Sequence, residues 1–244
     1  MKECSKSIQR RLGDPGFMAR YFRGQAIDIG GRPDPLSLYV ELFPLLESVR
    51  VWDVEDGDAE SLPGLTDEAF DLVHSSHCLE HLRDPRRGLQ SWFRVLKPGG
   101  HLVVTVPDED LYEQGRFPST FNLDHKWTFT ISKVDSWSDR SLNVLDLLKE
   151  LGPRADVHRV QLLDAGYRYA LPRYDQTLTP VGECGIEIVV RKRPVEEVEA
   201  GGRVRGAAQP DRETRIHLNQ YRDDLAVLKR ANAAAPPFGN DDEL

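Results

Sequence analysis

Short apolar segments alternate with helix-like segments between residues 26 and 193. Residues 26–29, 49–52, 70–74 and 101–106 have the pattern of buried strands, and each ends at a polar or glycine-containing turn. A later Ile- and Val-rich segment, residues 185–191, predicts a final strand. Strands that alternate with helices are typical of an α/β protein with a mostly parallel sheet.

Two helices in this region have clear sequence signals. Asp84 is a predicted N-cap, and Pro85 suits the first turn of the helix that follows. The apolar face of that helix is formed by Leu89, Trp92, Phe93 and Leu96. A later helix is predicted over residues 138–151, with Gly152 and Pro153 ending it.

The pattern divides the chain into four segments. Residues 1–25 form a basic leader that predicts one packed helix, and residues 26–193 form the α/β domain. Residues 194–210 have the charged, Gly- and Ala-rich composition of a linker. Residues 211–244 predict an amphipathic helix followed by an acidic tail. That helix either docks on the domain surface or serves a partner, such as a second copy in a homodimer.

Charge and cysteine usage narrow the class of protein. The 244 residues carry a formal net charge of −8, and no basic run is longer than residues 191–193, so nucleic acid is not an expected partner. No segment approaches the roughly 18 consecutive apolar residues of a membrane span, and no secretory signal precedes the domain. The three cysteines lie far apart and predict reduced thiols in a cytoplasmic protein.

The ends of the first two strands have the pattern of a nucleotide-cofactor site. The first strand leads into Asp28-Ile29-Gly30-Gly31, and the second ends at Asp53 about 20 residues later. A glycine turn lets the backbone approach a ligand, and the acid can accept hydrogen bonds from ribose hydroxyls. Asp58 and Ala59 follow the second strand, where an adenine amino group could be held.

Three further motifs carry a resemblance to a known family. They are Phe70-Asp71-Leu72-Val73, Leu79-Glu80-His81-Leu82 and Val95-Leu96-Lys97-Pro98-Gly99-Gly100. With them the chain resembles class I S-adenosylmethionine-dependent methyltransferases over about residues 26–110. The resemblance implies S-adenosyl-L-methionine as cofactor and a Rossmann-like, doubly wound sheet of about seven mostly parallel strands with helices on both faces. Arg32 stands where the family pattern has a second motif glycine.

The resemblance also implies roles for the cofactor site. Asp28 would support the turn, Gly30 and Gly31 would line the methionine portion, and Arg32 could meet its carboxylate. Asp53 would bind the ribose. The adenine would lie at Asp58 and Ala59, and the sulfonium side would face Ser75, Ser76 and His77.

The segment after the fourth strand is long, polar and aromatic, and it predicts the acceptor side of the site. Its candidate substrate-binding residues are Asp108, Glu109, Tyr112, Asn122, Lys126 and Trp127. Such side chains suit a sugar, because they offer hydrogen bonds to hydroxyls and apolar faces to the ring. We expect His125 to act as the general base, with His77 in reserve, because histidine titrates near neutral pH.

His77, Glu80 and His81 have the His-x-x-Glu-His spacing of some zinc sites. Because the Leu-Glu-His-Leu stretch belongs to the fold in general, we expect no bound metal. A magnesium-assisted site that uses Glu80 and His81 is the weaker alternative.

These observations predict a methyltransferase that O-methylates a sugar, a nucleotide-sugar or a surface-polysaccharide intermediate. The alternative enzyme methylates another small metabolite, at a phenol or phosphoryl group. A different class altogether is a non-catalytic module that binds an adenosyl ligand and uses the C-terminal helix as its interface.

Overall fold

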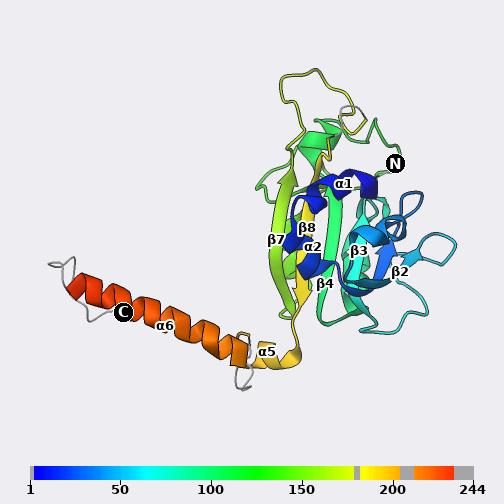
Figure 1. The fold of residues 1–244 in the computed structure, drawn as a ribbon. Coiled ribbons are helices and arrows are strands. Elements are labelled where there is room, and N and C mark those ends of the chain that lie inside the picture. Colours follow the sequence, from blue (N-terminus) through cyan, green and yellow to red (C-terminus); the bar gives the residue numbers. More distant parts are fainter. Residues whose placement is uncertain (1–2, 179–181, 204–211, 234–244) are drawn as a thin grey trace. The chain divides into compact units, whose positions relative to one another are not determined.

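The computed structural model describes residues 3–178, 182–203 and 212–233. The chain divides into two units, Met1–Gly202 and Arg203–Leu244 (Figure 1). The second unit contains one described helix, α6 (Arg212–Ala233), which covers the segment where the sequence predicts an amphipathic helix. Among the described residues, no helix combines the length and the apolar character that crossing a membrane requires.

A six-stranded sheet forms the centre of the first unit. Its strands are β1 (Gly24–Ile29), β2 (Leu46–Trp52), β3 (Phe70–Ser76), β4 (Leu96–Pro107), β7 (Ala155–Leu163) and β8 (Gly185–Lys192). They lie in the order β2-β1-β3-β4-β8-β7. The first four are parallel, and β8 runs antiparallel to both of its neighbours. The predicted α/β class is confirmed, with six strands in this sheet rather than about seven.

The strand order places a ligand site at one edge of the sheet. After β1 the chain moves outward to β2 and then returns to pair β3 on the other side of β1. In open α/β sheets, ligands bind outside the carboxyl ends of the strands at such a reversal. The expected site therefore lies at the ends of β1, β2 and β3.

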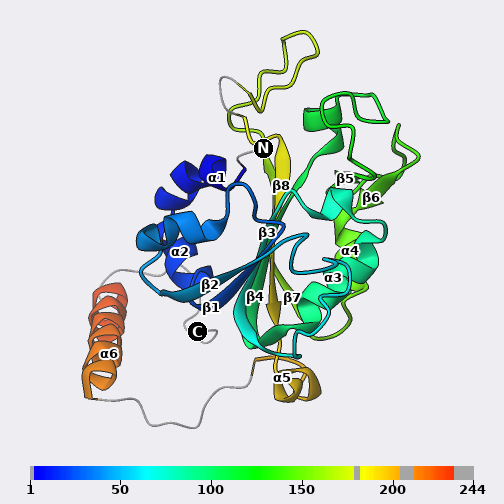
Figure 2. The same ribbon diagram turned by 90° about the vertical axis from the view of Figure 1, so that its right-hand side faces the viewer.

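Helices cover both faces of this sheet (Figure 2). One face carries α1 (Glu3–Leu12), α2 (Pro15–Tyr21) and the 3-10 segment η1 (Leu36–Leu42), whereas the other carries η2 (Leu79–His81), α3 (Pro85–Arg94) and α4 (Val144–Lys149). Residues 3–21 form two helices where the sequence predicts one, because Asp14 caps a new helix that starts at Pro15. The carboxylate of Asp14 accepts a hydrogen bond from the backbone N–H of Phe17 at 2.9 Å.

The structure confirms the predicted helix α3. The carboxylate of Asp84 accepts hydrogen bonds from the backbone N–H groups of Arg86 and Arg87, which fixes the start of the helix. Trp92 is fully buried, and its indole N–H donates to the carbonyl of Ala59 at 2.9 Å. This contact holds the segment after β2 against the helix.

The predicted helix over residues 138–151 is wrong in its first half. Residues 141–143 form strand β6 (Ser141–Asn143), which pairs in parallel with β5 (Thr128–Thr130). Helix α4 begins only at Val144. Asn143 is held in an extended conformation, because its side chain accepts from the backbone of Lys133 and donates back to it. A long-range partner thus decides the conformation of a segment whose local pattern favours a helix.

Two further short helical segments are η3 (Glu109–Glu113) and α5 (Val195–Glu199), the latter within the predicted linker.

A buried histidine on β4 makes stability depend on pH. Burial, together with the smaller effects of His158, Arg191, Arg23 and Arg20, lowers the pKa of His101 to about 4. His101 is therefore protonated below about pH 6.5 in the unfolded chain, but only below about pH 4 in the folded chain. Stability is lost as the pH falls through that window.

We expect the free energy of unfolding of the native protein to fall by about 2 kcal/mol more than that of a His101→Gln variant between pH 7 and pH 5. Urea unfolding of both proteins at the two pH values measures this difference, and all other titrating groups are shared. An identical pH dependence in the two proteins would remove His101 as its source.

Candidate functional site

Two adjoining cavities lie at the carboxyl ends of β1, β2 and β3. The cavity with the larger set of lining residues has a volume of about 290 Å³ and is called the main cavity. The adjoining space, of about 400 Å³, is called the side cavity. The main cavity is lined by Glu3, Cys4, Asp28, Gly30, Gly31, Arg32, Asp34, Asp53, Val54, His74, Ser76, His77, Cys78, His81, Asn122 and Asp124. The side cavity shares six of these residues and adds Trp52, Gly57, Asp58, Ala59 and Leu82. The shared wall includes Gly30 and Asp53, so the two spaces form one continuous site.

The glycine turn after β1 forms part of this shared wall. Gly30 has φ of +69°, and its N–H donates to the carbonyl of Trp52 at 2.8 Å. A Cβ on Gly30 would lie 2.6 Å from the side chain of Cys78, and one on Gly31 would lie 2.3 Å from an oxygen of Asp28. Both positions therefore need glycine to keep the wall in place. Both line the main cavity.

Asp28 lies at the base of the main cavity and ties the turn to the core. One of its oxygens is 2.6 Å from Nδ1 of His74, and the other accepts the N–H of Leu36 at 2.7 Å. Nε2 of His74 in turn lies 3.2 Å from the guanidinium of Arg11. This chain of contacts links the turn after β1 to β3 and to α1.

Asp53 ends β2 and presents its carboxylate where both cavities meet. One oxygen accepts the N–H of Arg32 at 2.9 Å, and the other accepts the N–H of Val54 at 2.8 Å. Each carboxylate oxygen can accept a second hydrogen bond, so two neighbouring hydroxyls could bind here. The side chain of Arg32 is 60% exposed and faces Glu55 at 3.7 Å.

The side cavity has apolar walls that suit a flat ring. Trp52 and Leu82 are buried, and Ala59 and Val54 add apolar surface to a lining that also contains Asp53, His81 and Asp124. Asp58 also lines this space, but its carboxylate already accepts from the backbone of Glu60 and the hydroxyl of Ser61.

Only two of the three residues predicted on the sulfonium side, at the end of β3, reach the main cavity. Ser76 and His77 line the main cavity, whereas Ser75 is fully buried and donates its hydroxyl to the carbonyl of Ile29. Ser75 therefore links β1 to β3 instead of reaching the cavity. Its place follows from the alternation along β3, which turns successive side chains to opposite faces.

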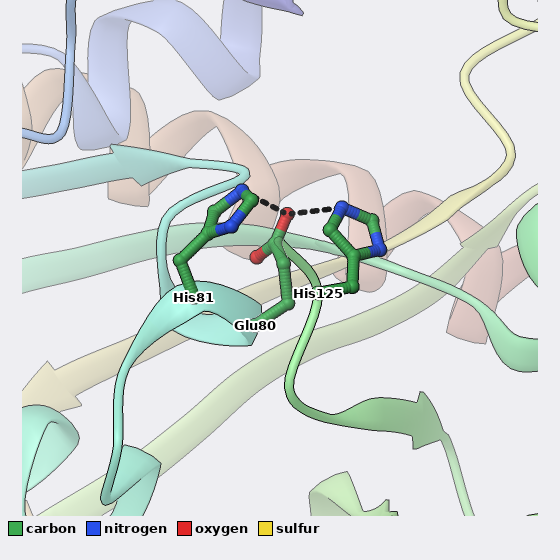
Figure 3. A group of neighbouring side chains, drawn as sticks. All are labelled: Glu80, His81 and His125. Carbon is green, nitrogen blue, oxygen red and sulfur yellow. Dashed lines mark ion pairs between the residues drawn. The ribbon is translucent and has the colours of Figure 1, made fainter. Parts of the chain in front are cut away.

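The carboxylate of Glu80 lies beside the main cavity with three histidines around it, and Figure 3 shows two of them, His81 and His125. Oε1 of Glu80 is 3.3 Å from Nδ1 of His77, and it is 3.9 Å from Nε2 of both His81 and His125. Burial alone would raise the pKa of Glu80, but the three histidines bring it below its ordinary value. Burial opposes a proton on His77, but Glu3 and Glu80 raise the pKa of that histidine.

Two of these histidines each contact a further carboxylate through the ring nitrogen that does not face Glu80. Nδ1 of His125 is 2.7 Å from Oε1 of Glu113, and Nδ1 of His81 is 2.9 Å from Oδ2 of Asp124. His125 is completely buried and is not part of the cavity wall, whereas His81 is 26% exposed and lines both cavities. His125, the predicted general base, thus does not reach the cavity, whereas the neighbouring His81 forms part of its wall.

The acceptor-side prediction is only partly matched by the structure. Of the six predicted substrate-binding residues, Asn122 alone lines the main cavity. Asp108 caps η3 through the backbone N–H groups of residues 110 and 111, and burial raises its pKa to about 6. Glu109 is buried and accepts from Lys133, Ser136, Thr128 and Ser141.

Asp108 and Glu109 therefore organise the loop and do not face the cavity. The remaining three predicted residues also hold the loop in place. Tyr112 is buried, with its ring centroid 5.0 Å from that of His125. The ammonium group of Lys126 donates to the carbonyl of His81 at 2.6 Å. The indole N–H of Trp127 donates to the carbonyl of Leu82 at 3.1 Å. These contacts fix the loop on η2, which is how His125 comes to face Glu80.

Sequence reasoning missed several residues of the wall. Glu3 and Cys4 reach it from α1, Asp34 from the turn after the glycines and Asp124 from the loop. Glu113, behind His125, was missed as well. No local signal could have found Glu3 or Cys4, because their position depends on how α1 packs across β4 and β8. Asp124 and Glu113 had a signal, since both are acids in the same loop as His125.

Comparison with known proteins decides the class of fold. Residues 41–104 match the family model described as a methyltransferase domain. A solved S-adenosylmethionine-dependent methyltransferase from Archaeoglobus fulgidus superimposes with a TM-score of 0.50 at 17% identity, covering 79% of this chain and 95% of that one. A Listeria monocytogenes protein assigned to the same class gives 0.50 at 14% identity, with coverage of 80% and 100%. The chain has the S-adenosylmethionine-dependent methyltransferase fold. This confirms the resemblance found in the sequence motifs.

Curated relatives match shorter parts of the chain. The ubiquinone/menaquinone biosynthesis C-methyltransferase UbiE of Pseudoalteromonas translucida is 29% identical over 113 residues, which are 45% of this chain and 43% of that protein. An uncharacterized transposon protein of Streptomyces fradiae is 41% identical over 64 residues, 26% of this chain and 18% of that protein. The match thus spans less than half the length of each of these relatives.

The methyltransferase fold implies S-adenosyl-L-methionine as cofactor, and the site fits it. A ribose needs acceptors for two hydroxyls, and the carboxylate of Asp53, which lines both cavities, is a group of that kind. An adenine needs apolar contacts, and Trp52, Ala59 and Leu82 offer them in the side cavity. The positive sulfonium group suits the main cavity, whose wall carries five carboxylates (Glu3, Asp28, Asp34, Asp53 and Asp124) and the single arginine Arg32.

Proposed function

We propose that this protein transfers the methyl group of S-adenosyl-L-methionine to a small polar acceptor. The observation that carries the proposal is the joined pair of cavities with Asp53 at their junction, on a methyltransferase fold. The cofactor supplies an electrophilic methyl group when bound. The protein's own residues then have to orient it, exclude water and present the acceptor in line.

The two cavities divide the cofactor between them. The base lies in the side cavity against Trp52 and Ala59, and Asp53 accepts two ribose hydroxyls. The amino-acid portion enters the main cavity, where Arg32 meets its carboxylate. The acidic wall favours the cationic cofactor over its neutral-sulfur product, so it also promotes product release.

The acceptor we propose is a hydroxyl group of a sugar, a nucleotide-sugar or a surface-polysaccharide intermediate. Support comes from Asn122, a hydrogen-bonding side chain in the main cavity to which no cofactor role is given, and from His77, which lines the same cavity on the sulfonium side. His77 and His125 are the proposed proton acceptors, and His77 is the one in the cavity wall. A phenolic or phosphoryl acceptor would meet the same groups.

Cofactor binding tests the site directly. We expect Asp53→Ala to weaken binding of S-adenosylhomocysteine by about 2–3 kcal/mol, because two hydrogen bonds to a charged group are lost. Isothermal titration calorimetry measures the affinity. Glu47→Ala serves as the matched control, since it removes an exposed acid from β2, the strand that leads to Asp53. Equal affinities for the native protein and Asp53→Ala would refute the ribose assignment.

Transfer of a labelled methyl group then tests the activity. The native protein is offered nucleotide-sugars and glycans, phenols, and a quinol-type carbon acceptor, the last because relatives carry the name C-methyltransferase. Label in the first group supports the proposed acceptor, and label in another group replaces it. Tight cofactor binding with no transfer to any acceptor would favour a non-catalytic module.

A further inference from the structure

Glu80 is a fully buried carboxylate that lacks hydrogen bonds. Its side chain is 0% exposed, and neither oxygen accepts a hydrogen bond from the described residues. Nε2 of His81 and of His125 lies 3.9 Å from Oε1, too far for a hydrogen bond, and Nδ1 of His77 lies 3.3 Å away without the geometry of one. An ionised carboxylate taken out of water costs several kcal/mol unless a cation or several donors compensate it. The three histidines supply part of this compensation as ion-pair neighbours, but no group of the described residues completes it with a hydrogen bond.

The histidine nitrogens that face Glu80 are also available to bind a further group. Nε2 of His125 is buried and has no hydrogen-bond partner within the described chain. Nε2 of His81 points at the same oxygen of Glu80, so the two rings converge from opposite sides (Figure 3). One ligand atom from each of the three residues lies within 4.8 Å of the others. A metal ion holds ligands at about 2.0–2.2 Å, which places pairs of ligand atoms roughly 3–4 Å apart.

The outer nitrogens of both rings are fixed in the manner of metal-binding histidines. Glu113 holds Nδ1 of His125, and Asp124 holds Nδ1 of His81. Histidine ligands commonly bind a metal through one nitrogen while the other donates to a carboxylate, which fixes the tautomer and directs a lone pair at the ion. In both rings the nitrogen left for an ion is the one that faces Glu80.

We propose that Glu80, His81 and His125 together bind one divalent first-row transition metal ion, such as Zn²⁺ or Mn²⁺. Two imidazoles with one carboxylate favour such an ion over Mg²⁺, which prefers oxygen ligands. The ion compensates Glu80 and the neighbouring buried Glu113 at once. This inference reverses the expectation of a metal-free site, and it goes beyond the proposed methyl transfer.

The site would face the acceptor. His81 lines both cavities, so an ion bound to it borders the space where the acceptor enters. Three protein ligands leave a coordination position for water or for an acceptor oxygen. A metal ion lowers the pKa of a bound hydroxyl, which is the task that a sugar acceptor requires.

Metal binding by the full-length protein tests the proposal without cofactor or acceptor. The protein is dialysed against a chelator and titrated with Zn²⁺, Mn²⁺ and Mg²⁺ in a calorimeter, and Co²⁺ is added separately as an absorption probe. We expect one equivalent of Zn²⁺ or Mn²⁺ to bind and the visible bands of Co²⁺ to report nitrogen and oxygen ligands. Mg²⁺ should bind at least tenfold more weakly.

Variants locate the site. Glu80→Gln keeps the shape of the side chain and should weaken binding roughly 100-fold or more, whereas Glu113→Gln should weaken it roughly 10–100-fold through His125. His158→Gln is the matched control, because it removes an imidazole on β7 that faces Asp156. No binding by the native protein, or equal binding by Glu80→Gln, overturns the proposal. Tighter binding of Mg²⁺ than of Zn²⁺ and Mn²⁺ overturns the choice of ion.

The Co²⁺ spectrum of the native protein needs no variant, so it decides the matter even if Glu80→Gln fails to fold. Because metal binding is measured without methyl transfer, its failure leaves the proposed activity standing. Failure of methyl transfer likewise leaves the metal site standing.

Discussion

Replacing His125 by alanine is expected to lower the kcat of methyl transfer by roughly 10²–10⁴-fold. His125 is fully buried behind His81, with its ring fixed by Glu113 and its free nitrogen directed at Glu80. As general base or as metal ligand it acts in the chemical step, and in neither role does it contact the proposed cofactor space. The affinity for S-adenosylhomocysteine should therefore stay within about threefold of the native value, a difference below 1 kcal/mol.

Steady-state kinetics between pH 6 and pH 9 and calorimetry with the product measure the two effects. Glu113→Gln is the companion variant, because it keeps the imidazole and removes the group that orients it. We expect an intermediate loss of kcat for Glu113→Gln, and thermal melts of both variants check that the fold is intact. A His125→Ala protein that keeps more than about a tenth of the native kcat would contradict any role in the chemical step.

Replacing Arg11 by methionine should lower the free energy of unfolding by about 3 kcal/mol, at the low end for breaking a buried ion pair. The side chain of Arg11 on α1 is completely buried, 3.5 Å from the equally buried carboxylate of Glu187 on β8. Its guanidinium also lies over the ring of Phe22, 4.8 Å from the centroid, and contacts His74. Methionine fills much of the volume but removes one of the three cations around Glu187, which keeps the partly exposed Arg10 at 2.9 Å and Arg159 at 3.6 Å.

Urea unfolding of the single and double variants measures this effect. In Arg11→Met with Glu187→Leu, both buried charges are gone, while Arg10 keeps Glu183 and Arg159 keeps Asp14. The double variant should regain at least half of the lost stability, since replacing a buried ion pair by apolar groups is often neutral. If it is less stable than Arg11→Met alone, the loss does not come from an uncompensated Glu187.

Local signals were sufficient for the centre of the fold. The strands at residues 26–29, 70–74 and 101–106 are buried apolar segments, and the start of α3 is set by one aspartate and one proline next to each other in the chain. The turn at Gly30 and the acid at Asp53 were also found, because their spacing is a property of a strand–turn–helix unit.

Long-range contacts explain what the sequence did not reveal. The strand at residues 141–143 exists because β5 pairs with it, and periodicity alone cannot show that partner. Ser75 and Ser76 are adjacent in the chain, but only the second reaches the cavity, because β3 turns them to opposite sides. The composition of the loop predicts Asp108 and Glu109 as sugar ligands. In the structure their carboxylates accept hydrogen bonds from backbone N–H and hydroxyl groups of the same loop.

The first helix has a consequence for how affinity is measured. Glu3 and Cys4 of α1 form part of the main cavity wall, and the backbone N–H of Ser5 donates to Asp34 of the same wall. Helix α1 and the turn at Asp34 therefore complete the cavity together. A ligand that contacts this wall selects molecules in which α1 is docked, so its apparent dissociation constant is the intrinsic one divided by the docked fraction. Changes in α1 far from the ligand then alter the measured affinity through a population, while every contact in the bound state stays the same.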